Sequence, residues 1–288
     1  MSGTITAGLD GTDHALAAAD WAAQEATRRG ASLRLVHAWV WRATDVGYVG
    51  DRPAEERWVR NVLDEAKARV AKQHPHLDVT TELLAQDPVP TLVTEVARAE
   101  MLVLGSRGYG AFAGHLVGSV SLQVLRQASG PVVMVREPGG DGAAQPPEVV
   151  IGVQDLGNDG DAVLGFAFTV AAERGATLRV VHAWSVPTAL AWSPGALYLA
   201  EEANGLAELN KGLLADTLKP WRVKYPQVEV AEQVEIGSAS GVLLSHSGSA
   251  DLVVVGRRRH GERVRRLGPV THAVLHHARA PVAVVPHD

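Results

Sequence analysis

Short apolar runs alternate along this chain with longer stretches in which apolar residues recur at helical spacing. Continuous β-branched runs such as VVMV are typical of parallel strands buried on both faces. In the first half the pattern predicts strands at 4–9, 33–38, 79–84, 101–104 and 132–135. Helical stretches lie between them, so the alternation predicts an α/β fold with a doubly wound parallel sheet.

The predicted helices have recognisable ends. The first begins near Thr12, a suitable N-cap, and stops at Gly30, a suitable glycine just beyond a helix. A second follows Pro53, a third covers 89–97, and a fourth starts after Gly118. Ligands of such sheets bind at the carboxyl ends of the strands, so the residues that follow each strand are the candidates for function.

The chain repeats itself once. The segment RRGASLRLVHAW at 28–39 returns as ERGATLRVVHAW at 173–184, and three further segments recur in the same order at similar offsets. A single domain has therefore been duplicated. We expect one domain at 1–138, a flexible Gly/Pro/Ala-rich linker at 139–147 and a second domain at 148–288.

Composition narrows the possible functions. The 288 residues are 46% apolar and 20% charged, which is the balance of a globular protein. The absence of cysteine excludes disulfides, thiolate zinc sites and a cysteine nucleophile. No signal peptide and no long apolar run is present, so no membrane span and a cytoplasmic location are expected. A net charge of −5 does not favour a protein that coats nucleic acid.

A glycine-rich passage follows the fourth predicted strand. It reads GSRGYGAFAGHLVGSVS from 105 to 121 and leads into the fourth helix. Exposed backbone N–H groups, a helix N-terminus and the hydroxyls of Ser119 and Ser121 together make a phosphate site. The other interpretation is that these glycines only permit turns.

Two common nucleotide motifs do not explain this passage. A Walker A lysine is missing. The segment GYGAFA at 108–113 matches G-x-G-x-x-A, but a dinucleotide fingerprint belongs after the first strand with an acid about 20 residues on. We interpret that match as accidental.

The spacing G-x2-G-x9-G-S, from Gly105 to Ser119, is more specific. With GLDG at 8–11, LVHA at 35–38 and PVVMV at 131–135, the chain resembles a tandem universal stress protein over nearly its whole length. The resemblance implies two tandem doubly wound, five-stranded parallel-sheet domains, Rossmann-like and similar to adenine nucleotide alpha hydrolases. It also implies pairing of the two copies through 132–135 and 282–285 as an internal pseudo-dimer, and it allows a further homodimer.

In the ATP-binding branch of that family the glycine motif holds ribose and phosphates. Carried over, Leu9 and Asp10 would flank adenine and ribose, and Ala38 would offer backbone groups to adenine. The loop and helix start would line the ribose and phosphates. The resemblance thus implies ATP with Mg²⁺ on Leu9, Asp10, Ala38, Gly105, Arg107, Gly108, Gly118, Ser119, Val120 and Ser121. Asp10 could instead cap the helix that starts near Thr12, and the two roles could coexist.

The second copy has lost this signature. Gln154 stands in place of Asp10, Arg259 in place of Gly108, and Pro269, which has no N–H, in place of Ser119. We therefore expect one ATP per chain, in the first copy.

Two features of the second copy allow other interpretations. Six arginines between Arg257 and Arg266 could bind an anion, a nucleic acid or an acidic partner, or form a solvated loop paired with acids such as Glu262. The solvated loop is the favoured interpretation. His272 and His276 have helical zinc-ligand spacing, but a third ligand is missing, so a surface helix is expected instead of a metal site.

Three function classes remain at this point. They are an ATP-binding stress-response or regulatory protein, a slow ATPase or phosphotransferase, and a partner-binding scaffold without nucleotide. Phosphoryl transfer needs a cationic clamp, metal carboxylates and a base, and the first copy offers few such groups. Binding is therefore favoured over fast chemistry, and no catalytic residue is assigned.

Overall fold

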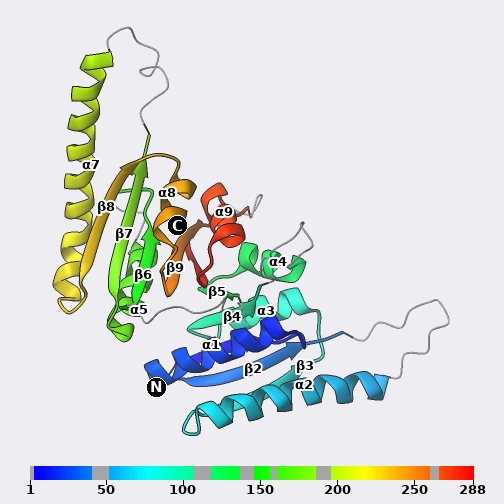
Figure 1. Ribbon diagram of the computed structural model, residues 1–288. Coiled ribbons are helices and arrows are strands. Elements are labelled where there is room, and N and C mark those ends of the chain that lie inside the picture. The colour runs from blue at the N-terminus through cyan, green and yellow to red at the C-terminus, as the bar shows by residue number, and fades with distance from the viewer. Residues whose placement is uncertain are drawn as a thin grey trace, which may run out of the picture. The chain divides into compact units, whose positions relative to one another are not determined.

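The computed structural model describes residues 3–40, 52–106, 118–136, 146–156, 161–185, 196–259 and 266–288. The chain divides into two compact units, Met1–Gly140 and Asp141–Asp288. The division falls inside the stretch predicted as a linker. Figure 1 shows strands and helices alternating along the chain in both units.

The first unit holds a parallel sheet with strand order β3-β2-β1-β4-β5 in its described residues. Helices α1 and α2 pack against each other and the sheet, and α3 and α4 form a second such pair. The elements are β1 (Thr4–Gly8), α1 (Asp13–Arg29), β2 (Ser32–Ala38), α2 (Arg52–Gln73), β3 (Val79–Leu84), α3 (Pro88–Val96), β4 (Met101–Gly105), α4 (Ser119–Gln127) and β5 (Val132–Val135).

The second unit repeats this topology with strand order β8-β7-β6-β9-β10, again parallel. Here α5 pairs with α7, and α8 pairs with α9. The elements are β6 (Glu148–Gly152), α5 (Asp161–Arg174), β7 (Thr177–Trp184), α7 (Ala196–Lys224), β8 (Val230–Ile236), α8 (Ala239–His246), β9 (Leu252–Arg258), α9 (Pro269–His277) and β10 (Val282–His287). The predicted α/β fold with parallel sheets is confirmed.

The ends of α1 are those that the sequence predicts. Thr12 is the N-cap, and its hydroxyl accepts a hydrogen bond from the Ala15 N–H. Gly30 takes a left-handed conformation with φ of 60°, which costs a residue with a side chain more than it costs glycine. In contrast, α2 begins at Arg52, ahead of Pro53, because proline is well tolerated in a first helical turn.

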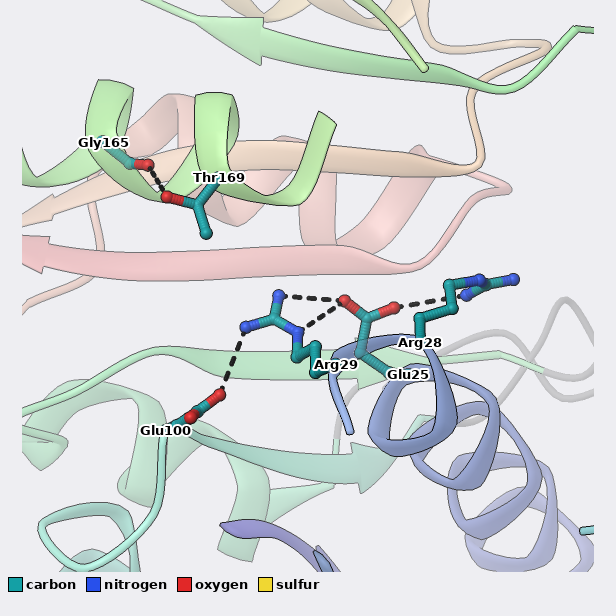
Figure 2. Close-up of polar contacts among 6 residues, drawn as sticks. All are labelled: Glu25, Arg28, Arg29, Glu100, Gly165 and Thr169. Atoms are coloured by element: carbon teal, nitrogen blue, oxygen red, sulfur yellow. Dashed lines mark hydrogen bonds and ion pairs between the residues drawn. The ribbon is translucent and has the colours of Figure 1, made fainter. Parts of the chain in front are cut away.

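The two units build their outer helices from different side chains. Helix α1 buries a face of alanines, including Ala15, Ala18 and Ala22. In the second unit, Phe168 of α5 stacks on Trp221 of α7 and on Tyr225, which directly follows that helix. Figure 2 shows Thr169, whose hydroxyl donates to the Gly165 carbonyl and lies 2.9 Å from the Tyr225 hydroxyl.

A buried charge lies near the C-terminal end of α1. Glu25 is fully buried, and Figure 2 shows its carboxylate between Arg28 and Arg29. Arg29 donates to one carboxylate oxygen from Nε at 3.0 Å and from a terminal nitrogen at 2.9 Å. Arg29 also reaches Glu100 at 3.4 Å. Charge-assisted pairs of this kind offset the desolvation of a buried carboxylate, so the cluster is structural.

Among the described residues, no helix has the length and apolar character needed to cross a bilayer.

Candidate functional site

The topology of the first unit locates the candidate site. The chain runs from β1 outward to β2 and β3, then returns to β4 on the other side of β1. The switch point therefore lies between the carboxyl ends of β1 and β4, where a doubly wound sheet binds its ligands. Leu9 and Asp10 follow β1, Gly105 ends β4, and α4 begins shortly afterwards.

Gly105 is required by packing, independently of any ligand. A Cβ at this position would lie 2.5 Å from the backbone carbonyl of His14, so a side chain would collide with α1. The neighbouring Ser106 is buried, and both its N–H and its hydroxyl donate to the Val135 carbonyl. The glycine after β4 is therefore first a condition for close helix–sheet packing.

Gly118 has no such structural reason. It is the N-cap of α4, with φ of −62°, and among the described residues no atom lies within 4 Å of the position that its Cβ would occupy. Glycine supplies no side-chain cap, so the first N–H groups of the helix, from Ser119, Val120 and Ser121, have neither a capping side chain nor an intrahelical acceptor. Open space beside exposed donors is the geometry that an anion needs.

The three residues at the start of α4 differ in exposure. Ser119 is exposed, while Val120 and Ser121 are half-buried. The Val120 side chain lines a shallow depression of about 470 Å³ with Asp87 and Pro88 at the start of α3. Only the backbone of Val120 is therefore a candidate for contact with a ligand at the helix start.

Asp10 helps to cap the start of α1, which is the alternative role that the sequence predicted for it. Its Oδ1 accepts from the Thr12 N–H at 3.1 Å and from the Thr12 hydroxyl at 2.6 Å. Both of these hydrogen bonds are accepted by Oδ1, and Asp10 is exposed. Asp10 thus positions the N-cap while Oδ2 faces no partner within that motif.

Leu9 and Ala38 supply backbone at the same edge. Leu9 is buried, and its N–H donates to the Val36 carbonyl at 2.8 Å. Backbone groups alternate sides along a strand, so Ala38, two residues beyond Val36, directs its backbone toward β1 as well. Because β1 ends at Gly8, the Ala38 carbonyl lies beside the residues that follow that strand.

Arg107 and Gly108 lie outside the described residues. The structure thus brings eight of the ten predicted positions to one edge of the sheet, at the ends of β1, β2 and β4 and at the start of α4. It does not test the two positions in the loop.

His37 and Trp58 border this edge and were not assigned to the predicted site. The His37 ring meets Trp58 of α2 edge to face, with centroids 6.1 Å apart. Trp58 is 53% exposed, and its ring lies beside Gly11, where a Cβ would come within 2.8 Å. Burial lowers the pKa of His37, and the charge of Asp10 opposes that shift in part. The exposure of Trp58 depends on tertiary packing, which the sequence pattern does not reveal.

The second unit places different groups at the equivalent edge. Gln154 and Asp155 follow β6, and β9 continues to Arg258 because Pro286 and His287 of the longer β10 pair with Arg257 and Arg258. Helix α9 begins with Pro269 after an N-cap glycine without a side-chain cap. A cavity of about 940 Å³ lies among these segments.

The favoured interpretation of the arginine cluster as one solvated loop was wrong for Arg257, and right only in part for Arg258. Both residues belong to β9, and Arg257 is buried with an exposed fraction of 6%. Arg258 is exposed and forms an ion pair with an acid, Asp155, while Glu262 lies outside the described residues. The error arises because the length of β9 depends on its distant neighbour β10.

Histidines of the second unit lie in two places. His272 and His276 stack with ring centroids 4.3 Å apart on α9, and no cluster with metal-ligand geometry occurs in the described part of the chain. His182, the counterpart of His37, lies 3.0 Å from the Val153 carbonyl and 3.2 Å from the Asn210 amide oxygen. The His182 ring thus contacts both the backbone that follows β6 and a side chain of α7.

Comparison with known proteins identifies the family. The model of the Universal stress protein family matches residues 1–136 and again 148–286. The chain belongs to the universal stress protein family. A universal stress protein of Mycobacterium tuberculosis is 36% identical over 97% of this chain and 96% of its own length. Another from the same organism is 32% identical over 99% and 96% of the two chains.

Solved structures agree on the fold. A universal stress protein from Archaeoglobus fulgidus superposes with a TM-score of 0.68, at 17% identity, over 99% of both chains. A putative universal stress protein from Pseudomonas aeruginosa superposes with a TM-score of 0.61, at 17% identity, over 99% of this chain and 93% of that one. This universal stress protein is thus a tandem of two family domains whose carboxyl edges carry different chemistry.

Proposed function

We propose that this protein is a nucleotide-binding regulatory or stress-response protein that holds one ATP, with Mg²⁺, in its first unit. The observation that carries the proposal is the start of α4. Gly118 there is needed neither for its backbone angles nor for packing, and it leaves open space beside uncapped N–H groups. A phosphate group would occupy that space and accept from those donors.

The residues of the first unit suit the parts of ATP in turn. Asp10 has a carboxylate oxygen outside its capping bonds, which can accept from a ribose hydroxyl. The Ala38 backbone and the exposed Trp58 ring border the place for the base. Ser119 and Ser121 add hydroxyl donors, and Arg107 and Gly108 keep their proposed contacts with ribose and the first phosphates.

The bound nucleotide would bring Mg²⁺ with it. Mg²⁺ retains several waters and is commonly held by phosphate oxygens with few protein carboxylates. The described residues offer no acidic cluster for a preformed metal site. The proposal therefore places Mg²⁺ on the triphosphate.

The groups at this edge favour binding over rapid phosphoryl transfer. Such transfer needs a positioned base and cationic groups on the transferred phosphate. Asp10 is committed to Thr12 through one oxygen, and burial lowers the pKa of His37, which disfavours the cationic form of that ring. Slow hydrolysis is the outcome that would move the protein into the enzyme class.

Calorimetry of the full chain with ATP, ADP and AMP, with and without Mg²⁺, tests the proposal. We expect saturable heat with ATP and weaker binding of AMP, because AMP lacks the phosphates that would reach α4. A parallel assay of released phosphate distinguishes binding from turnover. No heat and no thermal shift with any of the three nucleotides would contradict the proposal. The partner-binding scaffold would then be the remaining function class.

Pairing of the two copies through 132–135 and 282–285, and a further homodimer, remain predictions. The mass of the full chain in solution, measured by light scattering, tests the homodimer.

A further inference from the structure

The cavity of the second unit has no assigned ligand. Its volume is about 940 Å³, within the size range of small-molecule sites. Residues after β6, the end of β9 and the start of α9 line it, so it lies at the topological switch point of that unit. Loss of the family signature has therefore left a cavity in place.

The inner wall of this cavity is apolar. Val181 of β7, Leu164 of α5 and Leu243 of α8 line it, and each is almost fully buried in the fold. Val153 and Val255 extend the same surface at the ends of β6 and β9. The accessible apolar area comes from Ala183, Leu267 and Val270, which also line the cavity and are half-buried, and a ligand that covers it gains free energy in proportion to that area.

The charged residues of the described lining are mainly basic. Three arginines, Arg257, Arg258 and Arg266, line the cavity with one carboxylate, Asp155. Asp155 already pairs with Arg258. The excess of positive charge is local, since the whole chain carries a net charge of −5. Arginines next to an apolar wall attract a ligand with an anionic end.

The same lining is poorly suited to a nucleotide. Gln154 lacks the carboxylate that Asp10 offers a ribose, and among the described residues the rings that line the cavity are those of histidines, with no tryptophan, tyrosine or phenylalanine to stack on a base. Pro269 removes one N–H from the start of α9, so the helix offers fewer donors to a chain of phosphates. The basic side chains thus take over the role that backbone donors have in the first unit.

We propose that the second unit binds an organic anion with an apolar body, of the chemical class of a carboxylate on an aliphatic chain. The apolar body lies against Ala183, Leu267 and Val270, the accessible apolar residues of the lining. The anionic end lies toward Arg258 and Arg266, where it competes with Asp155 for Arg258. The proposal is independent of nucleotide binding in the first unit.

Fluorescence of anilinonaphthalene sulfonate, an apolar anion that emits in apolar surroundings, measures the binding in the full chain. Dodecanoate should displace the dye, whereas dodecanol, which has the same body without charge, and ATP should displace it much less. Displacement by ATP as strong as that by dodecanoate would overturn the proposal in favour of a second nucleotide site. Equal displacement by dodecanol would overturn the role of the arginines.

Three variants and one control, Arg279→Gln, locate the binding. Ala183→Leu places a larger side chain in the cavity and should weaken dodecanoate binding roughly tenfold or more. Arg266→Gln should weaken it several-fold, while Arg279→Gln, an exposed arginine outside the cavity, should not. Asp155→Asn should strengthen binding by removing the competing carboxylate.

Folding of each variant is checked by its thermal transition. If Ala183→Leu fails to fold, the changes at exposed Arg266 and half-buried Asp155 still test the proposal. Unchanged affinity in both Arg266→Gln and Asp155→Asn, or weaker binding in Asp155→Asn, would overturn the proposal.

Discussion

The two units share one topology, but their fourth strands end differently. In the first unit β4 stops at Gly105 and α4 starts with three residues that each carry a backbone N–H. In the second unit β9 continues to Arg258 and α9 starts with proline. A duplicated fold can therefore keep its core while the carboxyl edge of the sheet takes on different charge and shape.

Substitutions at Gly118 and Gly268 test most strongly whether only the first unit binds ATP. Both are N-caps with room for a side chain, so valine should be tolerated by the fold at either position. Gly118→Val should weaken ATP binding by more than about a hundredfold, because the side chain fills the space proposed for phosphate. Gly268→Val should leave ATP affinity unchanged. Calorimetry measures both, and an equal loss in the two variants would remove the asymmetry.

Substitutions of Asp10 and Thr12 distinguish a contact with the ligand from a role in helix capping. Asp10→Ala should weaken ATP binding roughly tenfold, the usual effect of losing a hydrogen bond to a charged group. Thr12→Ala should lower the free energy of unfolding by about 1 kcal/mol, since the cap is lost, with little change in ATP affinity. Urea unfolding and calorimetry of the two variants check the pair. ATP affinity that falls equally in both would mean that Asp10 acts only through the cap.

Trp58 should report on the first unit only. Its ring is half exposed beside Gly11, so a nucleotide at the carboxyl edge should change its fluorescence. Trp58→Phe should remove most of the ATP-dependent change in emission. Trp221→Phe, in the aromatic stack of the second unit, should retain it. A change that survives Trp58→Phe would place the base elsewhere.

His37 should give the smallest effect, a pH dependence of stability. Burial lowers its pKa in the folded state, so the unfolded chain takes up the proton more readily. Stability should fall as pH drops from the ordinary histidine pKa of about 6.5 toward the lowered value, and this contribution should be absent above that window. His37→Gln should flatten that part of the pH profile in urea unfolding. Profiles of the same slope would contradict the assignment.

Local patterns predicted most of the fold. The cap at Thr12, the left-handed Gly30 and the apolar strand at 33–38 depend on neighbouring residues, and the structure confirms them within a residue or so. The repeat of RLVHAW-like segments also predicted two similar units, because each copy carries its own complete set of strands.

The remaining features could not be predicted from the sequence because they depend on packing between residues that are distant along the chain. Gly105 resembles a ligand glycine in sequence, yet the backbone of His14 requires it. Arg257 resembles a loop residue, but pairing with β10 draws it into a strand and buries it. Trp58 meets His37 only because α2 returns across the edge of β2. Each of these depends on a residue distant in sequence, which periodicity does not record.

The number of nucleotides held per chain tests the central claim most directly. The purified full-length protein is saturated with ATP and Mg²⁺, freed of unbound nucleotide and denatured, and the released nucleotide is quantified against protein. One equivalent per chain, lost in Gly118→Val and kept in Gly268→Val, is the predicted result. Two equivalents, or none at saturation, would contradict a single ATP site in the first unit.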